Sequence, residues 1–129
     1  MYEPIPPETE RTAALVIEAA FRVHRALGPG LLESVYEACL CHELTKLGVP
    51  FQRQVDLPIV YDGKRLESGL RIDVLVANCV EVELKAVETM IPLYEAQMLT
   101  YLKLTNQRLG LLINFNVQRL KDGIKRLVL

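Results

Sequence analysis

Two carboxylates and an amine lie within apolar, β-branched segments of this chain: Asp73, Glu83 and Lys85. The surrounding runs, residues 70–76 and 80–87, alternate with period two and are rich in Val and Ile. Such runs predict two strands joined by a tight connection. Charged groups in strands of this kind are candidates for chemistry, and two acids with an amine would suit a divalent-metal site that acts on phosphate.

The predicted register decides whether these groups meet. A turn centred on Asn78 would place Asp73 directly opposite Glu83, with Cβ atoms roughly 5 Å apart. Side chains two apart in a strand share a face, so Lys85 would project beside Glu83. A one-residue change of register would separate the carboxylates. The opposite face should enter a core through Ile72, Val74, Val76, Val80, Val82 and Leu84.

Two carboxylates placed this closely repel one another unless a cation lies between them. Mg²⁺ suits such a pair because it needs only one or two protein carboxylates and leaves positions for water and phosphate oxygens. Lys85 could then orient or help deprotonate a water molecule and stabilise charge on phosphate. In the alternative interpretation, Glu81, Glu83 and Lys85 form a solvated face that keeps the sheet soluble. The pattern taken alone favours that alternative.

Length and composition predict one domain over residues 1–129, with an irregular lead-in over residues 1–7. The formal net charge of -1 does not indicate a nucleic-acid partner, so any basic footprint must be local, as in the stretch with Lys125 and Arg126. Alternatively, these basic residues belong to an ordinary solvent-exposed surface. Three cysteines in no metal-like or paired spacing indicate reduced thiols. With no leader and no membrane-spanning run, a cytoplasmic protein is expected.

The order of elements predicts a mixed α/β fold, bordering on α+β, with helices packed against a mixed sheet. Pro58 suggests an edge strand or a bulge, and the two acids fall on central strands. The predicted elements are a helix from about Thr9 to Gly28, a helix from Leu31 to Leu47, a strand from Phe51 to Tyr61 with a turn at Asp62-Gly63, the hairpin around Asn78, a helix from Pro92 to Leu104, a strand from Leu109 to Phe115, and a tail from Val117 holding a helical turn and a strand.

Two helices carry further candidates. Glu33 lies near the start of the second helix and could supply a metal or water ligand, although an acid there also offsets the helix dipole. Tyr36, one turn on, is more typical of a core. On the third helix, Gln97 and Tyr101 are four residues apart and share a face, from which they could bond Lys85 or phosphate; packing is the alternative.

The segment Gly30-Leu31-Leu32-Glu33-Ser34-Val35-Tyr36 resembles the motif that names the GxxExxY protein family, within the PD-(D/E)XK nuclease superfamily. The resemblance runs from about Val23 to the C-terminus. Gln97 to Tyr101 also resembles the QxxxY motif of RecB-type nucleases. The other similar stretches are Gln54 to Pro58, Arg71 to Asp73, Val82 to Val87, Glu95 to Gln97 and Leu109 to Lys125.

The resemblance implies a nuclease-like core in which an active-site hairpin is flanked by helices. It implies that Asp73 and Glu83 bind Mg²⁺ or Mn²⁺, that Glu33 completes the metal site, and that Lys85 assists the water. It further implies supporting or substrate-binding roles for Gln97 and Tyr101, to which we add Tyr36. Ile72 replaces the proline of the superfamily's motif, which is tolerable because only the following Asp is a ligand. His24 stands where RecB-type enzymes place a metal-binding histidine, but a lone helical His is more often structural.

The leading hypothesis is therefore a Mg²⁺- or Mn²⁺-dependent nuclease that acts through a metal-activated water, with DNA as the first candidate substrate and RNA as the second. The alternative is an inactive nuclease-fold module that binds nucleic acid or a partner protein. Near-neutral charge favours this second hypothesis. A third is a structural domain with no metal affinity. An edge strand at Pro58 or in the tail could pair with a second copy of the chain to form a homodimer. Binding of a different protein is a further alternative.

Overall fold

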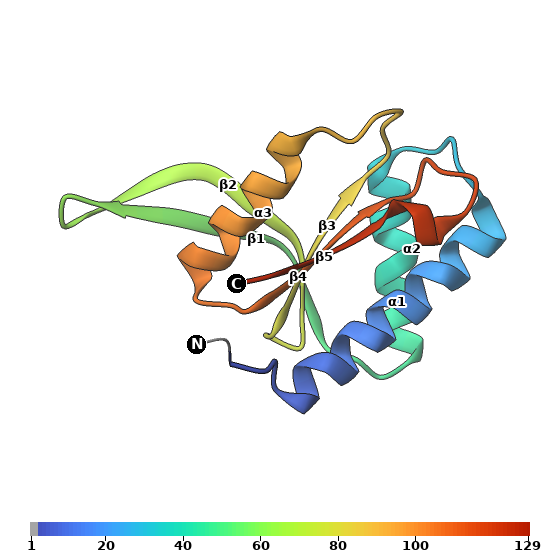
Figure 1. The fold of residues 1–129 in the computed structure, drawn as a ribbon, viewed down its shortest axis with the longest axis horizontal. Coiled ribbons are helices and arrows are strands. Elements are labelled where there is room, and N and C mark those ends of the chain that lie inside the picture. The colour runs from blue at the N-terminus through green and yellow to red at the C-terminus, as the bar shows by residue number, and fades with distance from the viewer. Residues whose placement is uncertain (1–2) are drawn as a thin grey trace.

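The computed structural model describes residues 3–129 and shows a five-stranded mixed sheet, with α3 on one side and α1 and α2 on the other (Figure 1). The strand order is β1-β2-β3-β4-β5; β3 and β4 are parallel and every other neighbouring pair is antiparallel. The predicted fold class is confirmed. The elements are α1 (Pro7–Leu27), α2 (Glu33–Lys46), β1 (Phe51–Tyr61), β2 (Lys64–Val76), β3 (Val80–Lys85), α3 (Pro92–Thr105), β4 (Leu109–Asn114), the 3-10 turn η1 (Leu120–Gly123) and β5 (Ile124–Val128).

The ends of α1 and α2 differ slightly from the predicted ones. The first helix begins at Pro7, because the fixed φ of proline suits the first helical position. The predicted lead-in over residues 1–7 therefore ends one residue early, and residues 1 and 2 lie outside the described part. Gly30 has a φ of 102°, and Leu32, two residues further on, is extended, so α2 begins at Glu33. Glu33 thus stands at the positive end of the helix dipole.

The main core lies between the sheet and the pair α1 and α2. The apolar face predicted for the hairpin is buried, but it is divided between two clusters, because Ile72 packs with Leu57 and Leu75 in a separate group. The remaining five residues of that face join the main core: Val74, Val76, Val80, Val82 and Leu84. Charged residues at alternate positions of β3 are consequently directed to the α3 side of the sheet.

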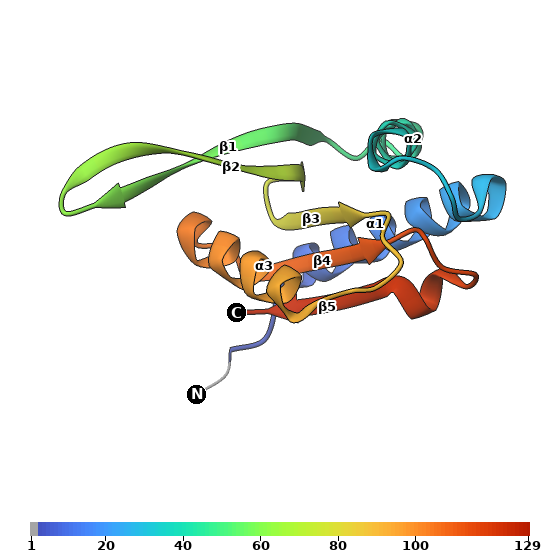
Figure 2. The ribbon, with the colours of Figure 1, turned by 90° about the horizontal axis from the view of Figure 1, so that it is seen from above.

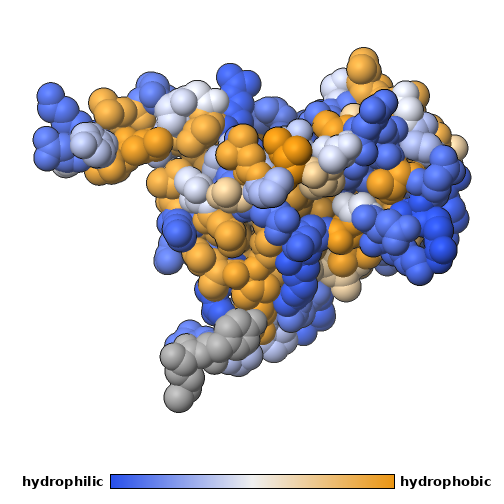
Figure 3. Space-filling view, turned by 45° about the horizontal axis from the view of Figure 1, so that its top comes forward, coloured by the Kyte–Doolittle hydropathy of each residue, from blue (hydrophilic) through white to orange (hydrophobic). Residues whose placement is uncertain are grey.

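Strands β1 and β2 extend beyond the body of the molecule as a two-stranded arm (Figures 1 and 2). The register shifts between Leu57 and Ile59, so the edge strand and bulge predicted at Pro58 are confirmed. Beyond this bulge the arm exposes apolar side chains among hydrophilic ones (Figure 3), and Val60 and Tyr61 are each 71% exposed. The same long strand β2 carries Asp73 at its other end. Within residues 3–129 there is no helix that is both long and apolar enough to cross a bilayer.

Candidate active site

The turn between β2 and β3 sets the register that brings the two acids together. Ala77 and Asn78 both have positive φ, at 50° and 54°, and the Cys79 amide donates to the Val76 carbonyl. Two central residues with positive φ define the tight hairpin turn that matches strand twist. Val76 then pairs with Val80, and the predicted register is confirmed.

Asp73 and Glu83 lie one position beyond the last backbone pair of β2 and β3, which is Val74 with Val82. Here side chains replace the backbone ladder. The Asp73 amide donates to Glu83 Oε1 at 3.3 Å, and the Leu84 amide donates to Asp73 Oδ2 at 2.8 Å. Each carboxyl is therefore held by the strand that carries the other one.

The two carboxyl groups are also coupled electrostatically. Burial raises the pKa of Glu83 to about 9, and the charge of Asp73 together with a hydrogen bond between the two carboxyl groups adds to this effect. Like charges this close cannot both ionise readily in a partly buried site. Without a cation, the pair therefore retains a proton at neutral pH.

Lys85 projects from the same face of β3 as Glu83. Its Nζ lies 4.3 Å from the centroid of the Tyr94 ring of α3, within the range of a cation–π contact. The lysine charge lowers the pKa of Glu83 and of Glu33, which opposes the effect of burial on both. The ammonium group is thus near both acids and is held by an aromatic face.

Glu33, at the start of α2, is coupled to the pair through its charge. Its side chain is exposed; partial desolvation raises its pKa, Lys85 lowers it, and Asp73 and Glu37 raise it. No set of three or more His, Cys, Asp or Glu side chains in residues 3–129 has the spacing to hold a metal ion. Glu33 is therefore electrostatically coupled to Asp73 and Lys85, while its role as a metal ligand stays a prediction.

Tyr36 is a supporting residue of the loop before Glu33. Its ring is fully buried and stacks on Phe115, with centroids 4.5 Å apart and an interplanar angle of 8°. Its hydroxyl donates to the Gly28 carbonyl at 2.6 Å and accepts from the Leu31 amide at 3.1 Å. These bonds fix the glycine-rich turn that presents Glu33, which gives a physical reason for tyrosine six residues after Gly30.

We expect Tyr36→Phe to lower the free energy of unfolding by about 1–3 kcal/mol, since two backbone groups of the loop lose a partner while the ring stacking stays. Chemical denaturation measures this change. Tyr61→Phe is the matched control, because Tyr61 lies exposed on the arm and should tolerate loss of its hydroxyl. Equal effects of the two substitutions would contradict the role assigned to the Tyr36 hydroxyl.

The two α3 candidates differ in exposure. Gln97 is exposed, whereas Tyr101 is half-buried, and its pKa is raised by burial and by the charges of Glu83 and Asp73. Tyr101 therefore borders the acid pair. The contacts of His24 are with other residues: its Nε2 lies 2.7 Å from the Val117 carbonyl, and its ring contacts Phe115.

Two buried polar residues outside the predicted site set brace the site. Glu37 accepts from Arg53 Nε at 2.9 Å and from Gln54 Nε2 at 2.8 Å, which ties α2 to β1. Asn114 bonds both the amide and the carbonyl of Val87, at 3.1 and 3.0 Å, and so holds the segment after β3. Glu37 lies one helical turn after Glu33, and this spacing was the sequence feature that could have indicated its place beside the site.

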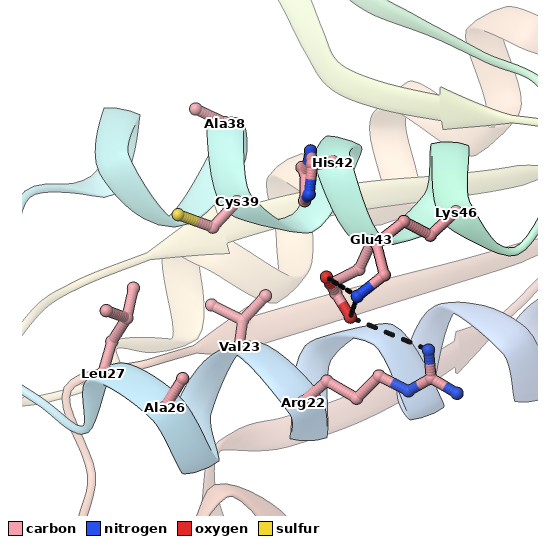
Figure 4. A pocket seen from close by; sticks show the side chains of 9 residues that line it. All are labelled: Arg22, Val23, Ala26, Leu27, Ala38, Cys39, His42, Glu43 and Lys46. Atoms are coloured by element: carbon pink, nitrogen blue, oxygen red, sulfur yellow. Dashed lines mark hydrogen bonds and ion pairs between the residues drawn. The ribbon is translucent and has the colours of Figure 1, made fainter.

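A cavity of about 470 Å³ lies between α1 and α2 (Figure 4). Glu43 pairs there with Arg22 and Lys46, at 3.7 and 3.1 Å. None of its lining residues belongs to the predicted site: Arg22, Val23, Ala26, Leu27, Ala38, Cys39, His42, Glu43 and Lys46. The cavity is therefore separate from the Asp73–Glu83 pair.

The fold and this face together define a mixed-sheet domain with two acids and a lysine on adjacent central strands. Residues 10–127 match the profile of the PD-(D/E)XK nuclease superfamily, and the chain belongs to that superfamily. Nucleases of this superfamily generally use divalent metal ions. No curated protein and no solved structure gave a match.

Proposed function

We propose that this protein is a divalent-metal-dependent nuclease of the GxxExxY family that hydrolyses phosphodiester bonds of DNA. The observation that carries the proposal is the cross-strand pair of Asp73 and Glu83, with Lys85 on the same face. Ionisation of both carboxyl groups is unfavourable without a cation, so a bound divalent ion would stabilise the fully ionised pair. One domain over residues 1–129 and a cytoplasmic location remain predictions.

The chemistry of this donor set fits Mg²⁺ or Mn²⁺. Carboxylate oxygens are the ligands that hard cations prefer, and such ions keep open positions for water and phosphate. We assign Asp73 and Glu83 to hold the ion, with Glu33 as a further ligand, directly or through water. When bound, the ion would polarise the phosphate and lower the pKa of a water molecule.

Side chains of the protein would orient the water, stabilise the phosphate charge and contact the substrate. Lys85 orients the attacking water and stabilises negative charge that develops on the phosphoryl oxygens. The Tyr94 ring limits where the lysine ammonium can lie. We assign Gln97 and Tyr101 to the substrate, because both are on the helix that borders the pair and one of them is exposed.

A second candidate function is binding of nucleic acid or a protein without turnover. The net charge of -1 favours this candidate over a DNA-cleaving enzyme. The ion pairs of the basic C-terminal stretch favour its protein-binding form, because Lys125 lies 3.4 Å from Glu95 and Arg126 lies 2.7 Å from Glu10. Cations engaged in this way have less charge to offer a phosphate backbone.

Cleavage of a substrate panel separates the two candidates. Single-stranded and duplex DNA and the corresponding RNAs would be incubated with the protein and Mg²⁺ or Mn²⁺, with a chelator as control. We expect metal-dependent cleavage, greatest on a DNA substrate. Binding of DNA without cleavage of any substrate would favour the binding module and contradict the proposed activity.

A further inference from the structure

Glu81 is a buried carboxyl group that the proposed chemistry does not use. It lies on β3, two residues before Glu83 and on the same side of the sheet, and its side chain is 0% exposed. Its Oε2 is hydrogen-bonded to the Thr105 hydroxyl at the end of α3. Its Oε1 has no hydrogen-bond partner among the described residues.

Close packing of α3 against the sheet explains why water does not reach this group. Glu81 pairs in register with Leu75 on one side and Gly110 on the other. A side chain at Gly110 would collide with Met98 of α3, so the helix rests almost directly on the backbone of β4. Met98 itself is fully buried. The pocket around the Glu81 carboxyl is therefore largely apolar.

Stability does not account for a carboxyl group in this place. A buried polar atom without a partner disfavours folding, and apolar residues of similar volume often replace buried charged groups without loss of stability. Buried unsatisfied groups in native proteins therefore call for another explanation. The remaining contact of Glu81, its bond to Thr105, indicates what that explanation is.

Thr105 connects Glu81 to the helical turn that carries Tyr101. The Thr105 hydroxyl lies 2.8 Å from the Tyr101 carbonyl and 3.3 Å from the Leu102 carbonyl as well as near the carboxyl. One chain of contacts thus runs from β3 through Glu81 and Thr105 to the Tyr101 backbone. Glu83 is two residues along the same strand, so the tether and Glu83 share one rigid element.

We propose that Glu81 is a positioning residue, which tethers the last turn of α3 to β3, the strand of Glu83, and so fixes Tyr101 beside Asp73 and Glu83. This inference rests on the proposed nuclease function, because it concerns how that site holds its substrate. Glu81 touches neither substrate nor metal in this account. It acts through the position of the helix.

The test compares Glu81→Leu, Glu81→Gln, Thr105→Val and the double variant Glu81→Leu with Thr105→Val. The Leu variant removes the tether but keeps the volume, and the Gln variant keeps a group that can bond the Thr105 hydroxyl. We expect Glu81→Leu to unfold at the same or higher denaturant concentration than the wild type, and Thr105→Val to unfold at a lower one, because it leaves the buried Glu81 carboxyl without its partner. Both should raise KM for DNA by about fivefold or more with little change in kcat, since substrate positioning is lost while the acid pair stays.

Rescue and coupling distinguish a tether from ordinary packing. Glu81→Gln should restore KM to near the wild-type value. The double variant should be no worse than either single variant, because two partners of one interaction are not additive. A wild-type KM in Glu81→Leu and Thr105→Val, or an equally raised KM in Glu81→Gln, would overturn the proposal.

Hydrogen exchange of the α3 amides supplies a readout that does not need activity. Exchange over residues 98–105 should be faster in Glu81→Leu and Thr105→Val than in the wild type and in Glu81→Gln. Unchanged exchange in both tether variants would overturn the proposal. If the wild type cleaved no substrate, the proposed function would fail by itself, and the exchange rates would still decide whether the tether exists.

Discussion

Lys85→Ala is expected to reduce metal-dependent cleavage by about 100-fold or more while the protein stays folded. A positioned group that orients water or stabilises transition-state charge typically contributes on the order of 10²–10⁴ in rate. The side chain lies over Tyr94 at the edge of the α3 interface and is not part of the core, so its loss should leave the fold intact. Initial cleavage rates and circular dichroism would measure the two effects.

Lys103→Ala is the matched control, since this lysine is exposed on α3 and belongs to no part of the proposed site. Its cleavage rate should remain within about twofold of the wild type, because surface substitutions remote from the chemistry have small effects. Similar losses in the two variants would mean that general surface charge, and not the placement of Lys85, supports cleavage.

Asp73→Asn is expected to abolish cleavage and yet to stabilise the metal-free protein, by roughly 1–2 kcal/mol at pH 8. The substitution removes the Asp73 charge, which adds to the cost of ionising Glu83. An asparagine oxygen can still accept from the Leu84 amide, and its amide group can donate to Glu83. Denaturant unfolding in the presence of a chelator measures the change. A less stable variant would put the paired-acid geometry in doubt.

The same pair predicts how the stability of the metal-free protein depends on pH. Glu83 has a pKa of about 9 in the folded chain against an ordinary value of 4.5. Between these values the folded state retains a proton that the unfolded state has released, so the free energy of unfolding falls as pH rises from about 4.5 to about 9. The decline should be smaller in Asp73→Asn. Asp56→Asn, which alters an exposed acid of β1, should leave the decline unchanged.

The hairpin of the site was predictable because its determinants are local. Period-two alternation allows only a register that buries the valines, and the turn at Asn78 then fixes which residues face each other. Proline and glycine likewise marked the ends of α1 and the start of α3 to within a few residues. For the same reason the bulge at Pro58 could be foreseen.

The surroundings of the site were less predictable because they depend on contacts between distant segments. The alternation of β3 shows that Glu81 shares a face with Glu83, but it does not show that α3 covers part of that face and leaves Glu81 fully buried. The interpretation of Glu81 as a solvated residue was wrong for this reason. The bonds of Glu37 to Arg53 and Gln54 also join separate elements, so no single periodic pattern contains them.

The long strand β2 connects the exposed arm to the site of the Asp73–Glu83 pair. One end forms the exposed arm, and the other end pairs with β3 from Val76 to Val74; at Asp73 this pairing stops and side-chain bonds replace it. Because the backbone pairing ends at this point, the carboxyl groups of Asp73 on β2 and Glu83 on β3 lie next to each other on one face of the sheet. The sheet thereby builds a candidate ligand pair without any loop.

Calorimetric titration of Mn²⁺ and of Mg²⁺ into the metal-free protein, beside Asp73→Asn and Asp56→Asn, would test the central claim most directly. We predict saturable binding to the wild type and to Asp56→Asn, with affinity at least about tenfold lower in Asp73→Asn, because only Asp73 belongs to the pair that would hold the ion. Absence of binding at millimolar metal, or equal affinity in Asp73→Asn and the wild type, would contradict the assignment of Asp73 and Glu83 as the metal site.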